Sequence, residues 1–178
     1  MKRFLSVLLI ICAVICFSPT SLDYIVGQAE ANDGESIPSI EAQGAILIEK
    51  NSEKILYAKN EKQRLYPAST TKILTALVVL ENTQAEEVIT VGEEIKQLDS
   101  SGSTAGLVLG QEITVGDLLR GLMLSSGNDA ANVLAVHTAR KVAGDSSLSW
   151  EEALNNFAAL MNQRASEAGA KSSNFTSP

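Results

Sequence analysis

The chain is short of the residues on which several common kinds of site depend. Its 178 residues include two cysteines and one histidine. Both cysteines, Cys12 and Cys16, lie in an apolar N-terminal run, so the rest of the chain has neither a thiol nor a disulfide. Because His137 is the only histidine, a zinc site built from histidine and cysteine is excluded, and no spaced cluster of carboxylates replaces it. We therefore expect no metal.

Basic charge and long apolar runs are also scarce. The 14 Lys and Arg residues against 21 Asp and Glu residues give a net charge of -7, which argues against nucleic acid as a partner. The apolar run from Phe4 to Phe17 follows a basic head and is too short to span a membrane, but it suits a signal-peptide core. Since Ala29-Glu30-Ala31 fits a cleavage site, residues 1–31 are predicted to be a signal peptide; the alternative is an uncleaved N-terminal anchor.

Hydrophobic patterning predicts one domain over residues 42–178, after a flexible leader at 32–41. A hairpin is expected from residues 44–50 and 54–59, and further strands at 88–91, at 113–115 and near Asn174. The expected helices are 69–81, 117–124, 129–141 and 149–169. The first of these is apolar on nearly every side, which is typical of a helix buried in a larger domain. The pattern favours an α+β fold with α/β/α layers.

A lysine stands where the start of a helix normally favours negative charge. Lys72 follows Ser69 by three residues, where a capping serine would pair with Glu or Gln, and it opposes the helix dipole by about 0.3–1 kcal/mol. One turn of helix places both side chains on the same face, within reach of a hydrogen bond. Apolar neighbours should lower the pKa of Lys72, so that its neutral amine can accept the serine's proton. The alternative is that Ser69 is only a helix N-cap.

A second polar cluster lies at the junction of two predicted helices. Ser126-Gly127-Asn128 places a hydroxyl and an amide on one tight turn, and Gly127 permits close approach of backbone or substrate. Such a pair can relay a proton to a leaving amine and hold an amide substrate in register. Short polar residues at such a junction also serve as caps, so that interpretation stays open.

S-x-x-K followed by S-x-N is the first two-thirds of the motif set of penicillin-binding proteins and class A β-lactamases. With the flanking stretches Pro67 to Ile73 and Ser126 to Ala131, residues 42–178 resemble the low-molecular-mass penicillin-binding proteins, which are serine-type D-alanyl-D-alanine carboxypeptidases. The resemblance implies the β-lactamase-like transpeptidase fold and no cofactor. The expected location is the extracytoplasmic face of the bacterial envelope, in the periplasm or cell wall, which agrees with an export signal.

The resemblance also implies a role for each matching residue. Ser69 would be the acyl-ester nucleophile, Lys72 its general base, Ser126 a proton relay and Asn128 a ligand of the substrate's peptide amide. The family removes the terminal D-alanine from peptidoglycan stem peptides ending in D-Ala-D-Ala, and β-lactam antibiotics acylate the same serine. The family's third motif, Lys-Thr-Gly, is absent from the chain. We therefore expect a truncated catalytic domain, incomplete at its C-terminus.

Two other functions agree with part of the sequence pattern. A class A β-lactamase is one, because Glu151 begins an E-x-x-L-N pattern like the one that carries the deacylating glutamate there, although Glu151 also suits the first turn of a helix. A non-catalytic envelope-binding protein of the same fold is the other, and the missing third motif favours it. His137 is interpreted as a structural or surface histidine, because no serine-histidine-acid arrangement surrounds it.

Overall fold

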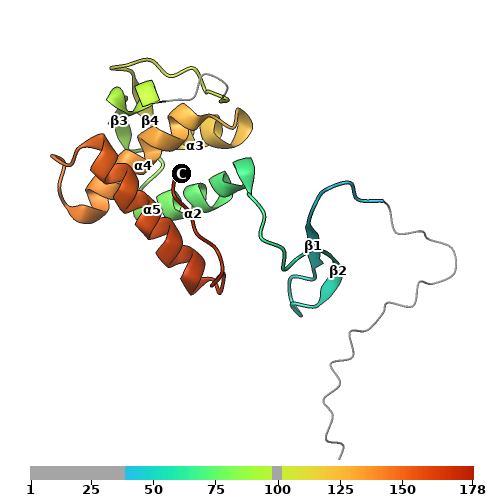
Figure 1. Cartoon of the computed structure of the whole chain (residues 1–178). Helices are drawn as coiled ribbons and strands as arrows, with labels where there is room; N and C mark the ends of the chain where they lie inside the picture. Colours follow the sequence, from blue (N-terminus) through green and yellow to red (C-terminus); the bar gives the residue numbers. More distant parts are fainter. Residues whose placement is uncertain (1–38, 98–101) are drawn as a thin grey trace, which may run out of the picture. The chain divides into compact units, whose positions relative to one another are not determined.

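The computed structural model of the chain describes residues 39–97 and 102–178 (Figure 1). The predicted signal peptide at residues 1–31 and most of the predicted leader at 32–41 lie outside the described residues. The chain divides into two units, Met1–Gln63 and Arg64–Pro178. In the described part of the chain, no helix is long and apolar enough to cross a membrane.

The first unit contains the predicted hairpin. Strands β1 (Ala45–Ile48) and β2 (Ile55–Lys59) pair antiparallel, with Leu47 opposite Tyr57. The Glu49 carboxylate organises the turn between them, because it accepts hydrogen bonds from the backbone N–H groups of the two turn residues Asn51 and Ser52. The Ser52 hydroxyl, which donates to the same carboxylate, is the main cause that lowers the pKa of Glu49 to about 2. The hairpin prediction is confirmed.

The second unit begins with a 3₁₀ turn at Ala68–Thr70 and continues into helix α2 (Thr71–Asn82). Strands β3 (Val88–Thr90) and β4 (Glu112–Thr114) pair antiparallel, with Ile89 opposite Ile113. A second 3₁₀ turn spans Glu93–Gln97, and the remaining helices are α3 (Val115–Leu124), α4 (Asn128–Ala143) and α5 (Trp150–Glu167). Every predicted helix and every predicted strand before residue 170 is present, with shifts of a few residues at the ends.

The caps explain why the helix boundaries were predictable. Thr114 accepts a hydrogen bond from the backbone N–H of Asp117 at the start of α3. Ser149 and Glu152 form a full capping box at the start of α5. Gly144 ends α4 in the left-handed conformation, at φ 65°, which glycine adopts without steric cost. Each of these residues marks the helix end in the sequence as well.

Helix α4 is the centre of the second unit's core. It packs against α2, α3 and α5 (Figure 1), and nine of its 16 residues are buried. The largest fully buried side chains of the unit include those of Phe157, Leu118, Leu122 and Leu134. Val78 and Val79 of α2 belong to the same core, so one continuous core joins α2 and α4, the helices that carry Lys72 and Asn128.

Two expectations for the second unit are wrong. Helix α2 is not buried on all sides: Val78 and Val79 face the core, whereas Ile73 and Leu80 are 62% and 58% exposed. No strand forms in residues 170–178. There the Asn162 side chain donates to the Phe175 carbonyl and accepts from the Phe175 N–H, both at 2.7 Å. It thus occupies the two backbone groups that a strand would offer to a neighbour.

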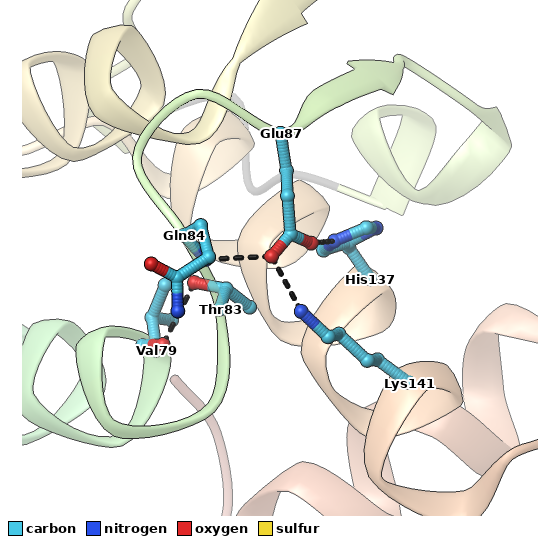
Figure 2. A network of polar contacts seen from close by, with 6 residues as sticks. All are labelled: Val79, Thr83, Gln84, Glu87, His137 and Lys141. Atoms are coloured by element: carbon cyan, nitrogen blue, oxygen red, sulfur yellow. Dashed lines mark hydrogen bonds and ion pairs between the residues drawn. The ribbon is translucent and has the colours of Figure 1, made fainter.

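A polar network joins the segment after the C-terminal end of α2 to the C-terminal half of α4. Figure 2 shows the Glu87 carboxylate between the side chains of His137 and Lys141 on α4 and the backbone N–H of Gln84, which lies just after α2. These hydrogen bonds, first of all the one from Lys141, lower the pKa of Glu87 to about 2. His137 is therefore a structural histidine, which is one of the two interpretations that the sequence leaves open.

The substitution Glu87→Gln should weaken this connection. It removes the charge that Lys141 and His137 bind, and we expect the free energy of unfolding to fall by about 1–2 kcal/mol at about pH 7. Because the pKa of Glu87 is lowered in the folded state, its contribution is present above the unfolded pKa of about 4.5 and declines as the pH falls toward 2. Urea unfolding across this pH range tests the expectation. A difference between variant and wild type that stays constant with pH would contradict it.

Candidate active site

The two sequence motifs come together at the starts of α2 and α4. The hydroxyl of Ser126 donates to the hydroxyl oxygen of Ser69 at 2.9 Å. The Lys72 amine donates to the side-chain oxygen of Asn128 at 2.7 Å. The turn between α3 and α4 therefore contacts both members of the Ser69 and Lys72 pair, although 56 or 57 residues separate the partners in the sequence.

Lys72 is the second residue of α2, and the residue is only 8% exposed. Burial disfavours the charged amine and lowers the pKa of Lys72 from its ordinary value, which is the direction that the sequence predicts. A neutral amine can donate one hydrogen to Asn128 and still keep a lone pair for a proton. Ser69, by contrast, is exposed and accessible to a substrate.

The hydrogen-bond partners of Ser69 and Lys72 differ from those that the spacing predicts, because, in the part of the chain that the structure describes, the two side chains bond to the second motif and not to each other. Among the hydrogen bonds of the described residues, the Lys72 amine reaches Asn128 and not Ser69. Ser69 lies in the 3₁₀ turn, one residue before the Thr70 N-cap of α2, and no side chain caps this helix start. The interpretation of Ser69 as a simple N-cap is therefore wrong, because its hydroxyl bonds to Ser126 and Thr70 holds the cap position.

Backbone strain is concentrated beside the serine pair. Ala68, directly before Ser69, and Ser126 both have left-handed backbone conformations, at φ 49° and φ 53°. Such conformations are unfavourable for residues with a Cβ atom and persist where the surrounding structure imposes them. The two hydroxyl groups that meet at 2.9 Å thus lie on or next to left-handed backbone.

The segment before β4 packs closely against the Ser126–Asn128 turn. The Asn128 N–H donates to the Ser103 carbonyl at 2.8 Å. A Cβ atom on Gly127 would lie 2.8 Å from the backbone nitrogen of Ala105, which is too close, so glycine is required here by contact and not by its φ of -65°. The sequence predicts close approach at Gly127 but does not identify its neighbour, because 22 residues separate Gly127 from Ala105.

Other candidate residues lie outside this cluster. Glu151 is an exposed first-turn residue of α5, which agrees with its interpretation as a helix-start acid and does not favour the β-lactamase reading. No group of three or more His, Cys, Asp or Glu side chains that could hold a metal ion occurs within residues 39–97 and 102–178.

Comparison with known proteins decides the family. The family model described as D-alanyl-D-alanine carboxypeptidase matches residues 31–178. The chain belongs to this family. Over its whole length it is 35% identical to the D-alanyl-D-alanine carboxypeptidase DacF of Bacillus subtilis, and over 87% of its length it is 34% identical to DacA of Haemophilus influenzae. It spans 42% and 38% of these two relatives.

Solved structures show the same fold. The Streptomyces K15 DD-transpeptidase matches 80% of this chain with a TM-score of 0.71 and 32% identity, and 54% of that protein is covered. Penicillin-binding protein 5 of Haemophilus influenzae matches 82% of this chain with a TM-score of 0.67 and 35% identity, and 40% of that protein is covered. The predicted family and the predicted α+β, penicillin-binding-protein-like fold are thus confirmed.

Proposed function

We propose that the chain carries the nucleophile and its base for a serine-type D-alanyl-D-alanine carboxypeptidase. Ser69 is the nucleophile, Lys72 the general base, Ser126 the proton relay and Asn128 the ligand of the substrate's peptide amide. The observation that carries the proposal is the contact of one turn with both halves of the first motif, through the Ser126–Ser69 and Asn128–Lys72 hydrogen bonds.

The chemistry follows from these positions. The Ser69 oxygen attacks the carbonyl carbon between the two D-alanines, and its proton passes to the neutral amine of Lys72. The C–N bond breaks, the leaving amine of the terminal D-alanine takes up the proton that Lys72 returns through the Ser126 hydroxyl, and the peptide remains as an ester on Ser69. Water then hydrolyses the ester. A β-lactam forms the same ester when its ring amide opens.

We further propose that residues 1–31 direct export, so that the site works on peptidoglycan stem peptides outside the cytoplasmic membrane. The basic head, the short apolar core and the small-x-small site support this proposal. The acidic balance of the remaining chain also agrees with a peptide substrate and not with nucleic acid.

Covalent labelling tests the function directly. The purified chain is incubated with a fluorescent penicillin, digested with trypsin and examined by mass spectrometry. We expect one adduct, on Ser69 within the tryptic peptide Leu65–Lys72. Release of D-alanine from a synthetic peptide ending in D-Ala-D-Ala is expected from the chain joined to a segment that carries Lys-Thr-Gly. A folded chain that forms no adduct would contradict the proposal. Rapid hydrolysis of nitrocefin without a lasting adduct would favour a β-lactamase instead.

A further inference from the structure

Asp129 is a buried carboxylate in the first turn of α4, next to Asn128. Its residue is 2% exposed. Burial of a carboxylate is unfavourable by several kcal/mol unless hydrogen bonds replace its water. An acid in the first turn of a helix needs no burial to interact favourably with the helix dipole. The position of Asp129 therefore calls for another explanation.

The explanation lies in a segment more than 20 residues earlier in the chain. One carboxylate oxygen of Asp129 accepts the Ala105 N–H at 2.7 Å, and the other accepts the Leu107 N–H at 2.9 Å. The first oxygen also accepts the N–H of Ala130 at 2.9 Å. The two loop N–H groups belong to a stretch without regular secondary structure, so the carboxylate supplies the acceptors that a strand or helix would otherwise provide.

The same segment also forms a hydrogen bond with Asn128, the residue that precedes Asp129. The Ser103 carbonyl accepts the N–H of Asn128, whose side chain accepts the Lys72 amine. The Ser103–Leu107 segment thus bonds to both Asn128 and Asp129. Two adjacent residues at the start of α4 are fixed in this way, and Gly127 alone separates them from the strained Ser126.

We propose that Asp129 is a positioning residue of the site. Its carboxylate binds the Ser103–Leu107 segment to the start of α4 through hydrogen bonds and so fixes the conformation of the Ser126–Asn128 turn. A left-handed Ser126 keeps its conformation only while the surroundings impose it. Without the hydrogen bonds of Asp129, the turn relaxes and the Ser126 and Asn128 side chains move away from Ser69 and Lys72. The inference rests on the proposed function, because the site that is positioned is the acylation site.

The substitution Asp129→Asn tests the inference with little change of shape. The amide keeps one acceptor oxygen but turns an NH₂ group toward the Leu107 N–H, so one hydrogen bond becomes a contact between two donors. The matched control is Asp117→Asn, the same change in the first turn of α3, where the carboxylate is exposed and bonds to Thr114 and Arg120. Both variants lose one negative charge at a helix start.

The first measurement is amide hydrogen exchange, which needs no catalytic activity. In Asp129→Asn the amides of Ala105, Leu107 and Asn128 should exchange about tenfold faster or more, since a hydrogen bond to a charged group is lost. The core amides of α4 should exchange as in the wild type. Unchanged exchange at the three amides would overturn the inference, and so would an equal acceleration throughout α4, which indicates general destabilisation.

The second measurement is the rate at which a penicillin acylates Ser69, resolved into binding and bond formation. Asp129→Asn should slow bond formation by about tenfold to a hundredfold with little change in binding, because the reacting groups are misplaced. Asp117→Asn should react as the wild type. Loosened amides with an unchanged rate would show a structural role only and overturn the inference. If the wild type itself is not acylated, the proposed function fails, and the exchange data alone decide whether Asp129 fixes the turn.

Discussion

Penicillin should leave no covalent adduct on the chain after the substitution Ser69→Ala. The change removes the only oxygen that we assign as nucleophile, and no neighbouring group replaces it in the assigned chemistry. The fold should persist, since Ser69 is exposed and, among residues 39–97 and 102–178, its side chain bonds to Ser126 alone. We expect the free energy of unfolding to stay within about 0.5 kcal/mol of the wild type, as for most surface substitutions.

Intact-mass spectrometry after incubation with penicillin measures this loss, and urea unfolding checks the fold. Ser125→Ala is the matched control, because Ser125 is exposed, carries the same hydroxyl and precedes Ser126 directly. It should be acylated at the wild-type rate. An adduct that persists in Ser69→Ala would show that another residue is the nucleophile.

The helices and strands were largely predictable because their end signals are local. Thr114, Ser149 and Gly144 each set a helix boundary through contacts within a few residues. Helix α2 was harder. Its composition indicates burial on every side, but composition does not tell which partner covers each face, and the face with Ile73 and Leu80 is exposed.

The residues of the site were predictable from the sequence, but their hydrogen-bond partners were not. Local spacing brings Ser69 and Lys72 near each other, but the partners that the structure gives them are Ser126 and Asn128, more than 50 residues away. Asp129 shows the limit more clearly. In the sequence it is a helix-start acid like many others, and only the fold reveals that it is buried against the backbone of Ala105 and Leu107.

Lys72→Met should separate catalysis from stability. Methionine matches the lysine side chain in length but has no amine, so the proton of Ser69 loses its acceptor. We expect acylation of Ser69 by penicillin to slow by about 10²- to 10⁴-fold, the usual contribution of a general base. In the wild type the rate should rise with pH through the lowered pKa of Lys72, as the amine becomes neutral. The variant should lack this rise in stopped-flow measurements of acylation.

The same variant should be at least as stable as the wild type at about pH 7. Because burial lowers the pKa of Lys72 in the folded state, the unfolded chain binds the proton more tightly, and this difference reduces the wild type's stability at pH values below the folded pKa. The reduction disappears as the pH rises toward the ordinary lysine value of 10.5. Methionine also removes a positive charge that opposes the α2 dipole. Urea unfolding of both proteins at about pH 7 and about pH 10 measures the effect. A variant that is less stable than the wild type at about pH 7 would indicate that Lys72 supports the fold through its hydrogen bond to Asn128 and is not kept for its chemistry.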